Sequence, residues 1–287
     1  MTSTAYDLYL PTRRATSVVF ASPHSGRDYS AEFLAASVLD ERTIRTSEDA
    51  FVDQILAVVP SFGAPLLAAR APRAFLDLNR GADELDPAVI EGARSFAHNP
   101  RIQSGLGVIP RVVAGGRAIY SGKLPLAEAR ARIAGFWHPY HDCLRRLLDE
   151  QRALFGQAIL VDVHSMPHEA MDAVAHRAGR RPEIILGDRY GASASSSIVE
   201  RIESALCDQG FRVGRNAPFA GAYVTQTYGR PAIGQHAIQI EIDRGLYMNE
   251  KTIRRSPDYA AFCARFAVVL AAIAAIGRPA EVDLAAE

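Results

Sequence analysis

The sequence has few cysteines and no excess of charge of either sign. Its three cysteines, Cys143, Cys207 and Cys263, are far apart and lie in helix-like segments. Neither a disulfide framework nor a cysteine zinc cluster is therefore expected, and buried structural thiols are the simpler interpretation. The 32 Lys and Arg residues balance 32 Asp and Glu residues, so no global field would recruit a nucleic acid or an anionic membrane.

Several targeting and catalytic signals are also absent. The N-terminus has no basic stretch followed by an apolar one, so we expect no signal peptide and a cytoplasmic protein. Residues 267–276 form an apolar run that is too short to span a bilayer, and we expect it to belong to a buried C-terminal helix. No Gly-x-Ser-x-Gly elbow and no Gly-rich phosphate loop is present, which disfavours a serine hydrolase of that type and a nucleotide enzyme.

What is present indicates an α/β protein. With 287 residues, 48% of them hydrophobic and 22% charged, the chain can bury a sizeable core. Strand-like and helix-like segments alternate, which is typical of a largely parallel sheet, and no repeat or linker divides residues 1–287, so we expect a single domain. The expected strands are residues 18–21, 65–69, 74–78, 158–163, 183–186 and 237–242, and the expected helices are residues 30–37, 50–59, 126–155, 195–208 and 257–276.

Two further features complete this outline. Pro139 should kink or break the long helix at residues 126–155, and the nearby residues 137–141 could line a pocket or pack against that kink. Residues 81–122 are rich in Gly, Pro and polar side chains and show no period. Long irregular stretches in compact domains tend to be functional, so we assign this one to the rim of an active site.

Two strand-like runs are each followed by His and Ser. Residues 158–163 lead into His164 and Ser165, and residues 18–21 lead into His24 and Ser25. Open α/β sheets bind their ligands at the carboxyl ends of their strands, so two imidazoles could meet there and begin a zinc site. Either histidine alone could simply cap its strand by hydrogen bonding, but the matching pair favours a metal.

A catalytic zinc usually has three protein ligands and a position for water. Glu48 and Asp49 are the candidates for the third ligand, although Asp49 could equally be the N-cap of the helix at residues 50–59. Asp162 lies two residues before His164 and therefore points to the same face of a strand. It could orient His164 through the outer ring nitrogen, or form a simple ion pair at the strand end.

A group that could bind an acidic substrate follows the run at residues 74–78. Arg80 lies beside Asn79, and an arginine fork binds carboxylates with two parallel hydrogen bonds. An ordinary surface ion pair explains Arg80 about as well. Arg73, at the start of the same segment, could instead donate to negative charge that develops on a scissile carbonyl.

Glu241 is the candidate general base. It alternates with isoleucines in residues 237–242, so its carboxylate would emerge from a strand otherwise fit for burial. A glutamate near a catalytic zinc commonly activates water, and desolvation there would raise its pKa. The alternative is a surface-facing glutamate on an edge strand.

Together these segments resemble the N-formylglutamate amidohydrolase family, a relative of the zinc carboxypeptidases and aspartoacylase. The resemblance covers most of the chain and implies a three-layer α/β/α fold with a mixed, largely parallel sheet and zinc at the strand ends. It also implies hydrolysis of N-formyl-L-glutamate to formate and L-glutamate, a step of histidine degradation. The segments that carry it, in the family's order, are residues 22–26, 48–49, 75–80, 138–141, 162–165 and 239–242.

The resemblance also assigns roles by position. The implied metal ligands are His24, Asp49 and His164, the implied base is Glu241, and the implied substrate-binding residues are Asn79 and Arg80. Carboxypeptidases take a carboxylate ligand three residues after the first histidine, where this chain has Arg27, so the third ligand must come from elsewhere. Some family members have Trp after the matching acid, where this chain has Ala50, and the exact substrate stays open.

Three hypotheses follow for the function. The first is a hydrolase with about one zinc per chain that acts on N-formylglutamate or a similar acidic N-acyl amino acid. The second is a deacylase or carboxypeptidase-like enzyme for another N-acyl substrate. The third is a metal-free binding protein that keeps the fold and the carboxylate clamp. None of them requires a nucleic acid or a membrane, and the oligomeric state stays open.

Overall fold

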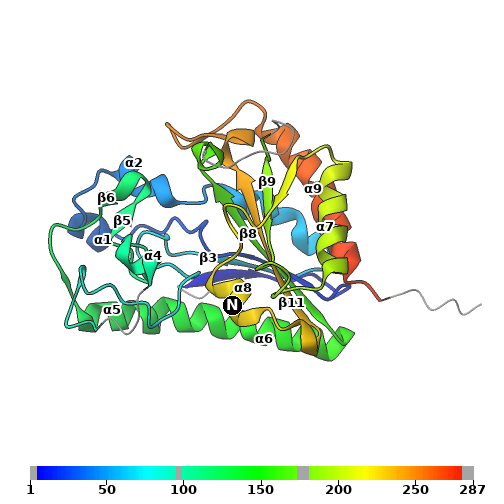
Figure 1. Cartoon of the computed structure of the whole chain (residues 1–287), viewed down its shortest axis with the longest axis horizontal. Helices are drawn as coiled ribbons and strands as arrows, with labels where there is room; N and C mark the ends of the chain where they lie inside the picture. Colours follow the sequence, from blue (N-terminus) through cyan, green and yellow to red (C-terminus); the bar gives the residue numbers. More distant parts are fainter. Residues whose placement is uncertain (1–4, 95–98, 173–180, 280–287) are drawn as a thin grey trace, which may run out of the picture.

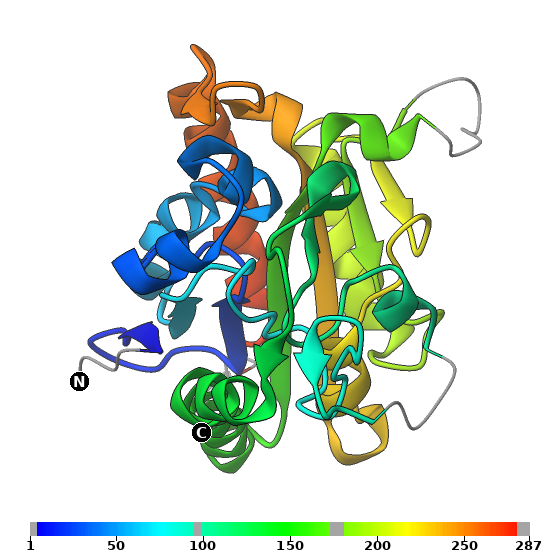
Figure 2. The same cartoon turned by 90° about the vertical axis from the view of Figure 1, so that its left-hand side faces the viewer.

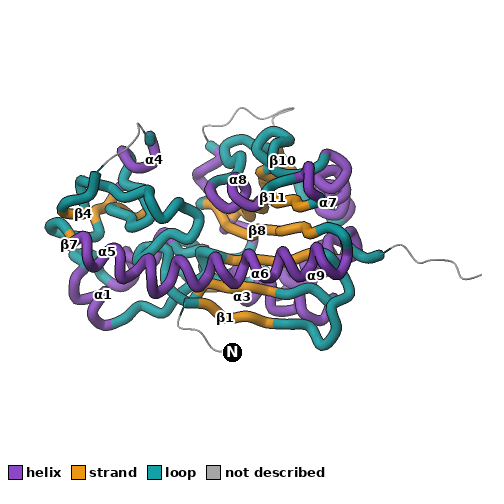
Figure 3. Tube along the Cα trace, turned by 90° about the horizontal axis from the view of Figure 1, so that it is seen from below, coloured by secondary structure: helices purple, strands orange, loops and turns teal. Residues whose placement is uncertain are grey.

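A seven-stranded mixed sheet forms the centre of the molecule (Figure 1). The computed structural model describes residues 5–94, 99–172 and 181–279. In spatial order the strands are β1 (Tyr6–Tyr9), β3 (Leu66–Ala69), β2 (Val18–Ser22), β8 (Ala158–Met166), β11 (Gln235–Asp243), β9 (Ile184–Gly187) and β10 (Val213–Arg215). Figure 3 shows them stacked from β1 at one edge to β10 at the other. Four neighbouring pairs are parallel, while β1 with β3 and β11 with β9 are antiparallel. The expected mixed, largely parallel sheet is confirmed.

Helices cover both faces of this sheet. The pair α5 (Leu126–Arg132) and α6 (His138–Phe155) lies on one face, and Figure 2 shows it end-on in green. On the other face lie α3 (Val52–Ile55), α7 (Ser196–Asp208) and α9 (Tyr259–Ile276). Within β2, Val18 and Phe20 join the core under α7 and α9, while Val19 and Ala21 join the core under α6. This alternation buries the strand on both sides, and the expected three-layer α/β/α fold is confirmed.

Five of the expected strands are found, as β2, β3, β8, β9 and β11. The strand expected at residues 74–78 is wrong. Those residues form a turn and a loop, because the N–H groups of Phe75 and Leu76 both donate to the carbonyl of Pro72, at 2.9 and 3.2 Å. Leu76 and Leu78 are nevertheless buried in the core, which explains why the run is apolar. The short edge strands β1 and β10 had not been expected.

The expected helices at residues 30–37, 195–208 and 257–276 are found as α1 (Ala31–Ala36), α7 and α9. The helix expected at residues 50–59 is only partly α-helical, since α3 is a single turn that continues as a 3₁₀ helix over Leu56–Phe62. Its N-cap is Phe51, at φ 69°, and not Asp49. The carboxylate of Asp49 is thus not used for capping.

Of the kink or break expected at Pro139, a break does not occur. A π-helical turn, Ile133–Trp137, joins α5 to α6, and the N–H of His138 donates to the carbonyl of Ile133. Proline has no N–H to donate, and the wider turn lets the chain stay helical through it. The result is the long green helix at the bottom of Figure 1.

The C-terminal helix α9 contains 18 residues, more than the apolar run at residues 267–276. By length and composition alone it could cross a membrane. However, Phe262, Phe266, Leu270 and Ile273 are buried in the core against the sheet. A core helix explains its apolar composition.

All three cysteines are free, but only Cys143 is buried. The expectation of buried thiols is wrong for Cys207, which is exposed on α7, and Cys263 is half-buried on α9. Where the structure describes it, the predicted irregular stretch at residues 81–122 holds only short elements. Besides short 3₁₀ turns, the remaining helices and strands of the described residues are α2 (Glu41–Ile44), β4 (Ile90–Glu91), α4 (Pro100–Gln103), β5 (Val112–Val113), β6 (Arg117–Ala118), β7 (Leu124–Pro125), α8 (Tyr223–Tyr228), β12 (Met248–Asn249) and β13 (Arg254–Arg255).

Candidate active site

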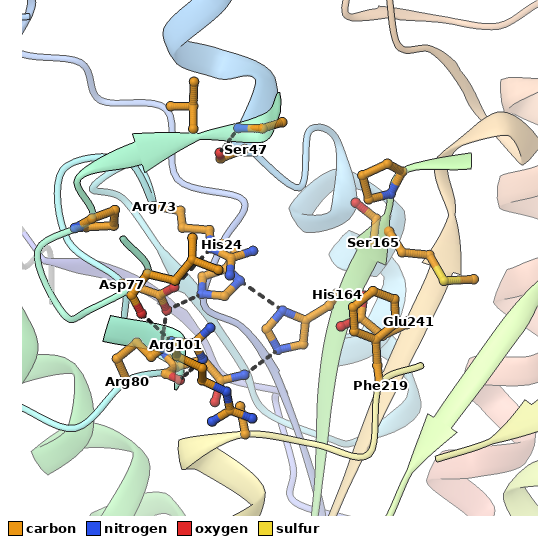
Figure 4. Close-up of a pocket in the computed structure, with 18 of the residues that line it drawn as sticks. His24, Ser47, Arg73, Asp77, Arg80, Arg101, His164, Ser165, Phe219 and Glu241 are labelled. Carbon is orange, nitrogen blue, oxygen red and sulfur yellow. Dashed lines mark hydrogen bonds and ion pairs between the residues drawn. The ribbon is translucent and has the colours of Figure 1, made fainter. Parts of the chain in front are cut away.

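The candidate site lies where three neighbouring parallel strands end. In the register of β8 and β11, Glu241 is paired with His164. On the other side of β8, Ala21 of β2 is paired with Asp162, so His24 follows β2 toward the same edge. The sheet itself therefore brings these side chains together, and Figure 4 shows the two histidines facing each other beside Glu241.

Three possible metal ligands meet at this edge. The Nδ1 atoms of His24 and His164 are 3.0 Å apart. Oδ2 of Asp49 lies 3.2 Å from Nδ1 of His164 and 3.6 Å from Nδ1 of His24. All three side chains are buried, with at most 2% of each residue exposed.

A second ring of carboxylates fixes the orientation of both histidines. Nε2 of His24 lies 2.7 Å from Oδ1 of Asp77, and Nε2 of His164 lies 2.9 Å from Oδ2 of Asp162. Since carboxylates accept hydrogen bonds, each ring can donate its outer N–H to them, which directs the Nδ1 atoms of both rings at the shared centre. Asp162 thus occupies the position expected of an orienting residue, whereas no role was predicted for Asp77.

This arrangement suits a cation. Two nitrogen lone pairs and a carboxylate oxygen repel one another at such short distances unless positive charge lies between them. Burial lowers the pKa of His164, but Asp162, Asp49 and Glu241 together raise it well above its usual value. Ligand atoms of a tetrahedral zinc site with bonds near 2.0–2.1 Å are about 3.4 Å apart, close to the 3.0, 3.2 and 3.6 Å found. The cluster could therefore hold a divalent metal such as zinc.

Of the two candidate third ligands, only Asp49 faces the histidines. Both carboxylate oxygens of Glu48 accept hydrogen bonds from Arg45, at 2.9 and 3.1 Å. Oδ1 of Asp49 accepts hydrogen bonds from Ser165 and Arg244. Burial opposes its charge, but hydrogen bonds from His164 and the charge of Arg244 keep the pKa of Asp49 well below its usual value. Asp49 is therefore ionised, as a metal ligand must be.

Glu241 lies on β11, between β8 and β9. The edge-strand alternative is therefore excluded, and the side chain lines the cavity. Its Oε1 accepts a hydrogen bond of 2.8 Å from Gln239. Burial raises the pKa of Glu241 to about 7, although the charge of His164 opposes the shift. A carboxylate with this pKa can both accept and return a proton near neutral pH.

The segment with Arg73, Asn79 and Arg80 reaches the site from a loop rather than from a strand end. Arg73 donates through Nε to Asp77, at 3.0 Å. Asn79 accepts a hydrogen bond from the N–H of Val224 at 2.8 Å, and its amide nitrogen lies 3.3 Å from Nε2 of His164. Asn79 is therefore held mainly by the protein.

The helical segment around Pro139 packs against the loop that contains Asn79 and Arg80. The indole of Trp137 donates to the carbonyl of Arg80 at 2.9 Å. His141 lies within hydrogen-bond distance of the carbonyl of Leu78 and the hydroxyl of Tyr228, both at 2.9 Å. Burial lowers the pKa of His141 to about 3, so its ring is neutral. Trp137 and His141 thus position the loop, and of the two alternatives packing is the one observed for His141.

The site opens into a cavity of about 550 Å³ that four arginines line. Two of them are paired: Arg73 with Asp77, and Arg244 with Asp49. Arg80 and Arg101 form no ion pair within the described residues. Arg80 donates instead to the carbonyls of Leu106 and Asn79, and Arg101 to the carbonyl of Gly221. Burial and the neighbouring charges of Arg73 and Arg101 lower the pKa of Arg80. A carboxylate bound beside Arg80 would offset this repulsion between positive charges.

Comparison with known proteins identifies the family of this chain. The family model for N-formylglutamate amidohydrolase matches residues 16–248. The chain belongs to the N-formylglutamate amidohydrolase family. It is 31% identical over 239 residues to an N-formylglutamate deformylase of Pseudomonas aeruginosa, covering 82% of this chain and 83% of that protein. It is also 30% identical over 240 residues to an N-formylglutamate deformylase of Pseudomonas putida, covering 81% of this chain and 82% of that protein.

Solved structures give the same result. An N-formylglutamate amidohydrolase from Ralstonia eutropha matches with a TM-score of 0.89 and 34% identity, over 96% of this chain and 98% of that one. The gene product Atu2144 from Agrobacterium tumefaciens shares the fold, with a TM-score of 0.61 and 19% identity. The resemblance seen in the sequence is therefore confirmed at the level of the family.

In this member of the N-formylglutamate amidohydrolase family, six of the expected site residues line one pocket, and the other two, Asp49 and Asp162, contact His164 behind it. The six are His24, Arg73, Asn79, Arg80, His164 and Glu241. Sequence reasoning missed Asp77, Arg101 and Arg244. Asp77 lies in the motif that also contains Asn79, and Arg244 directly follows Asp243 at the end of β11, so their positions gave some signal. Arg101 lies in the irregular rim, where no pattern distinguishes it.

Proposed function

We propose that this chain is a single-domain, metal-dependent amidohydrolase that cleaves N-formyl-L-glutamate, or a similar acidic N-acyl amino acid, to formate and L-glutamate. The observation that carries the proposal is the buried cluster of His24, Asp49 and His164 beside Glu241, at the base of a cavity lined with arginine. The names of the deformylase relatives support the choice of substrate.

The metal would be held by Nδ1 of His24, Nδ1 of His164 and Oδ2 of Asp49. When bound, a divalent ion supplies polarisation of the substrate carbonyl and a lower pKa for water. Asp77 and Asp162 hold the outer nitrogens of the two rings, which keeps the inner lone pairs directed at the ion.

Glu241 moves the proton. Its carboxylate takes a proton from the water that attacks the formyl carbon, as a new C–O bond forms. It then gives this proton to the amide nitrogen as the C–N bond breaks. Formic acid and a free amine leave, and transfer of the remaining proton between them gives formate and an ammonium group. Burial raises the pKa of Glu241, which helps its carboxyl group to hold the proton between the two transfers.

The arginines recognise the substrate and its transition state. Arg80 binds a carboxylate of the acidic substrate, because its guanidinium faces the cavity without an acidic partner of its own. Arg73 donates to the negative charge that develops on the formyl oxygen. Asp77 already occupies its Nε, so this contact is made by its terminal nitrogens.

Release of formate from N-formyl-L-glutamate, with and without a chelator, tests the proposal. We expect turnover that stops on chelation and returns when zinc is added. N-acetyl-L-glutamate and a peptide ending in glutamate serve as competing substrates. Faster cleavage of either would identify a deacylase or a carboxypeptidase-like enzyme instead, and acidic-ligand binding without turnover or metal would identify a binding protein.

A further inference from the structure

Arg244 is a buried arginine that makes contact with a proposed metal ligand. It directly follows Asp243, the last residue of β11, and opens a 3₁₀ turn, Arg244–Leu246. The carboxylate of Asp243 accepts the N–H of Gly245 at 2.8 Å and so stabilises this turn. Only 5% of Arg244 is exposed, so its contacts are made within the protein rather than with solvent.

All three nitrogens of this guanidinium are used. Nη2 donates to Oδ1 of Asp49 at 3.0 Å, Nε donates to Oγ of Ser165 at 3.1 Å, and Nη1 donates to the carbonyl of Thr46 at 3.1 Å. The hydroxyl of Ser165 in turn donates to Oδ1 of Asp49 at 3.2 Å. Oδ1 thus receives two hydrogen bonds, while Oδ2 alone faces His24 and His164.

We propose that Arg244 and Ser165 form a positioning pair that restricts Asp49 to one-oxygen binding of the metal. A carboxylate that could rotate would offer both oxygens and fill the coordination position that a catalytic site leaves for water. Charge-assisted hydrogen bonds to Oδ1 prevent this rotation. The inference rests on the proposed function, because it concerns the same metal centre.

Arg244 also lines the cavity, so direct binding of a substrate carboxylate is the competing role. The contacts favour positioning. Each nitrogen of Arg244 already has a protein partner, and its charge is paired with Asp49. Arg80, by contrast, donates only to backbone carbonyls.

The test measures zinc affinity and metal coordination separately from activity. Arg244→Gln, Arg244→Lys and Ser165→Ala are compared with Arg130→Gln, which removes an exposed arginine of α5 outside the cavity. Zinc affinity is measured by competition with a chromogenic chelator. We expect Arg244→Gln to weaken zinc binding about 10- to 100-fold, Ser165→Ala to weaken it less, and Arg244→Lys to restore part of the loss. The control should match the wild type.

Cobalt substitution gives the reading that a general structural defect would not reproduce. The visible absorption of bound cobalt(II) weakens as the ion gains ligands, so release of Oδ1 should lower the intensity in Arg244→Gln and, more weakly, in Ser165→Ala. Ser165→Ala also keeps the test decisive if Arg244→Gln fails to fold.

The outcomes are distinct. Unchanged zinc affinity and cobalt spectrum in Arg244→Gln, with a raised KM, would show a substrate-binding arginine and overturn the inference. An equal loss in Arg130→Gln would overturn it as well. If the wild type binds zinc but releases no formate from any substrate, the proposed function fails while the positioning pair is still decided by the spectra. A wild type without metal affinity overturns both.

Discussion

The two ends of the pocket are built differently. At the metal end, His164 lies on β8, His24 lies just after β2, and the N–H of Asp49 donates to the carbonyl of His24. Each of these three side chains has further protein partners that fix its orientation. At the mouth, Arg80 lies on a loop and Arg101 on the single turn α4, and within the described residues their side chains donate to backbone carbonyls. Under the proposed function this difference separates two tasks: the sheet would hold the groups for chemistry in place, and the loops would leave positive charge for a substrate to neutralise.

Electrostatics explains why both arrangements are stable. Buried charges at the metal end would be costly if unpaired, and there carboxylates alternate with imidazoles and the guanidiniums of Arg73 and Arg244. At the mouth, Arg101 is exposed and solvated, while Arg80 is buried but retains hydrogen bonds to carbonyls. A dianionic substrate would supply the negative charge that balances these two arginines.

The largest effect should follow from loss of a metal ligand. We expect His164→Ala to lose its zinc and to lower formate release by about 1000-fold or more, because a metal ion contributes several kcal/mol to such reactions. Metal analysis and the formate assay measure both. His138→Ala, an exposed histidine of α6, is the matched control. If metal-free His164→Ala kept full activity, the metal end of the pocket would not be needed for catalysis.

Glu241→Gln should have the next largest effect. Loss of a general base lowers kcat by about 100- to 10,000-fold, while zinc content should stay at the wild-type level because Glu241 is not one of the clustered ligands. Kinetics and metal analysis on the same sample check this. Glu200→Gln, an exposed glutamate of α7, controls for loss of charge. Turnover at the wild-type rate would show that another group moves the proton.

The metal end was also the part that the sequence could predict. Buried parallel strands appear as short apolar runs, and their carboxyl ends must meet at one edge, so polar residues after residues 18–21 and 158–163 could be placed together. Glu241 followed from the same reasoning, because a lone carboxylate alternates with isoleucines along β11. Each of these predictions depends only on periodicity and on the direction of a strand.

The mouth could not be predicted in this way. Residues 74–78 are as apolar as a strand because Leu76 and Leu78 enter the core from a loop, and burial alone does not distinguish the two. Arg101 contacts the carbonyl of Gly221, which is 120 positions away, and at the metal end Arg244 contacts Asp49, which is 195 positions away. Their contacts depend on how loops and turns pack, which no local pattern encodes.

At the mouth, Arg80→Gln should show the larger effect. Removal of a buried guanidinium from a charged hydrogen bond costs about 2 kcal/mol or more, which is a loss of about 30-fold in kcat/KM. We expect this loss mainly in KM for N-formyl-L-glutamate, and little change for a neutral formamide without carboxylates. An equal loss on both substrates would mean that Arg80 supports the loop and does not bind a carboxylate.

Arg101→Gln should have the smallest effect and the strongest dependence on salt. Arg101 is exposed, so its attraction for a carboxylate is screened by water and by ions. We expect kcat/KM for N-formyl-L-glutamate to fall about 3- to 10-fold at low ionic strength and the difference from the wild type to shrink as salt is added. The loss in Arg80→Gln should persist at high salt, because that guanidinium is buried. If the loss in Arg101→Gln were large and independent of salt, Arg101 would have to be enclosed when substrate binds, and the mouth would then be as rigidly organised as the metal end.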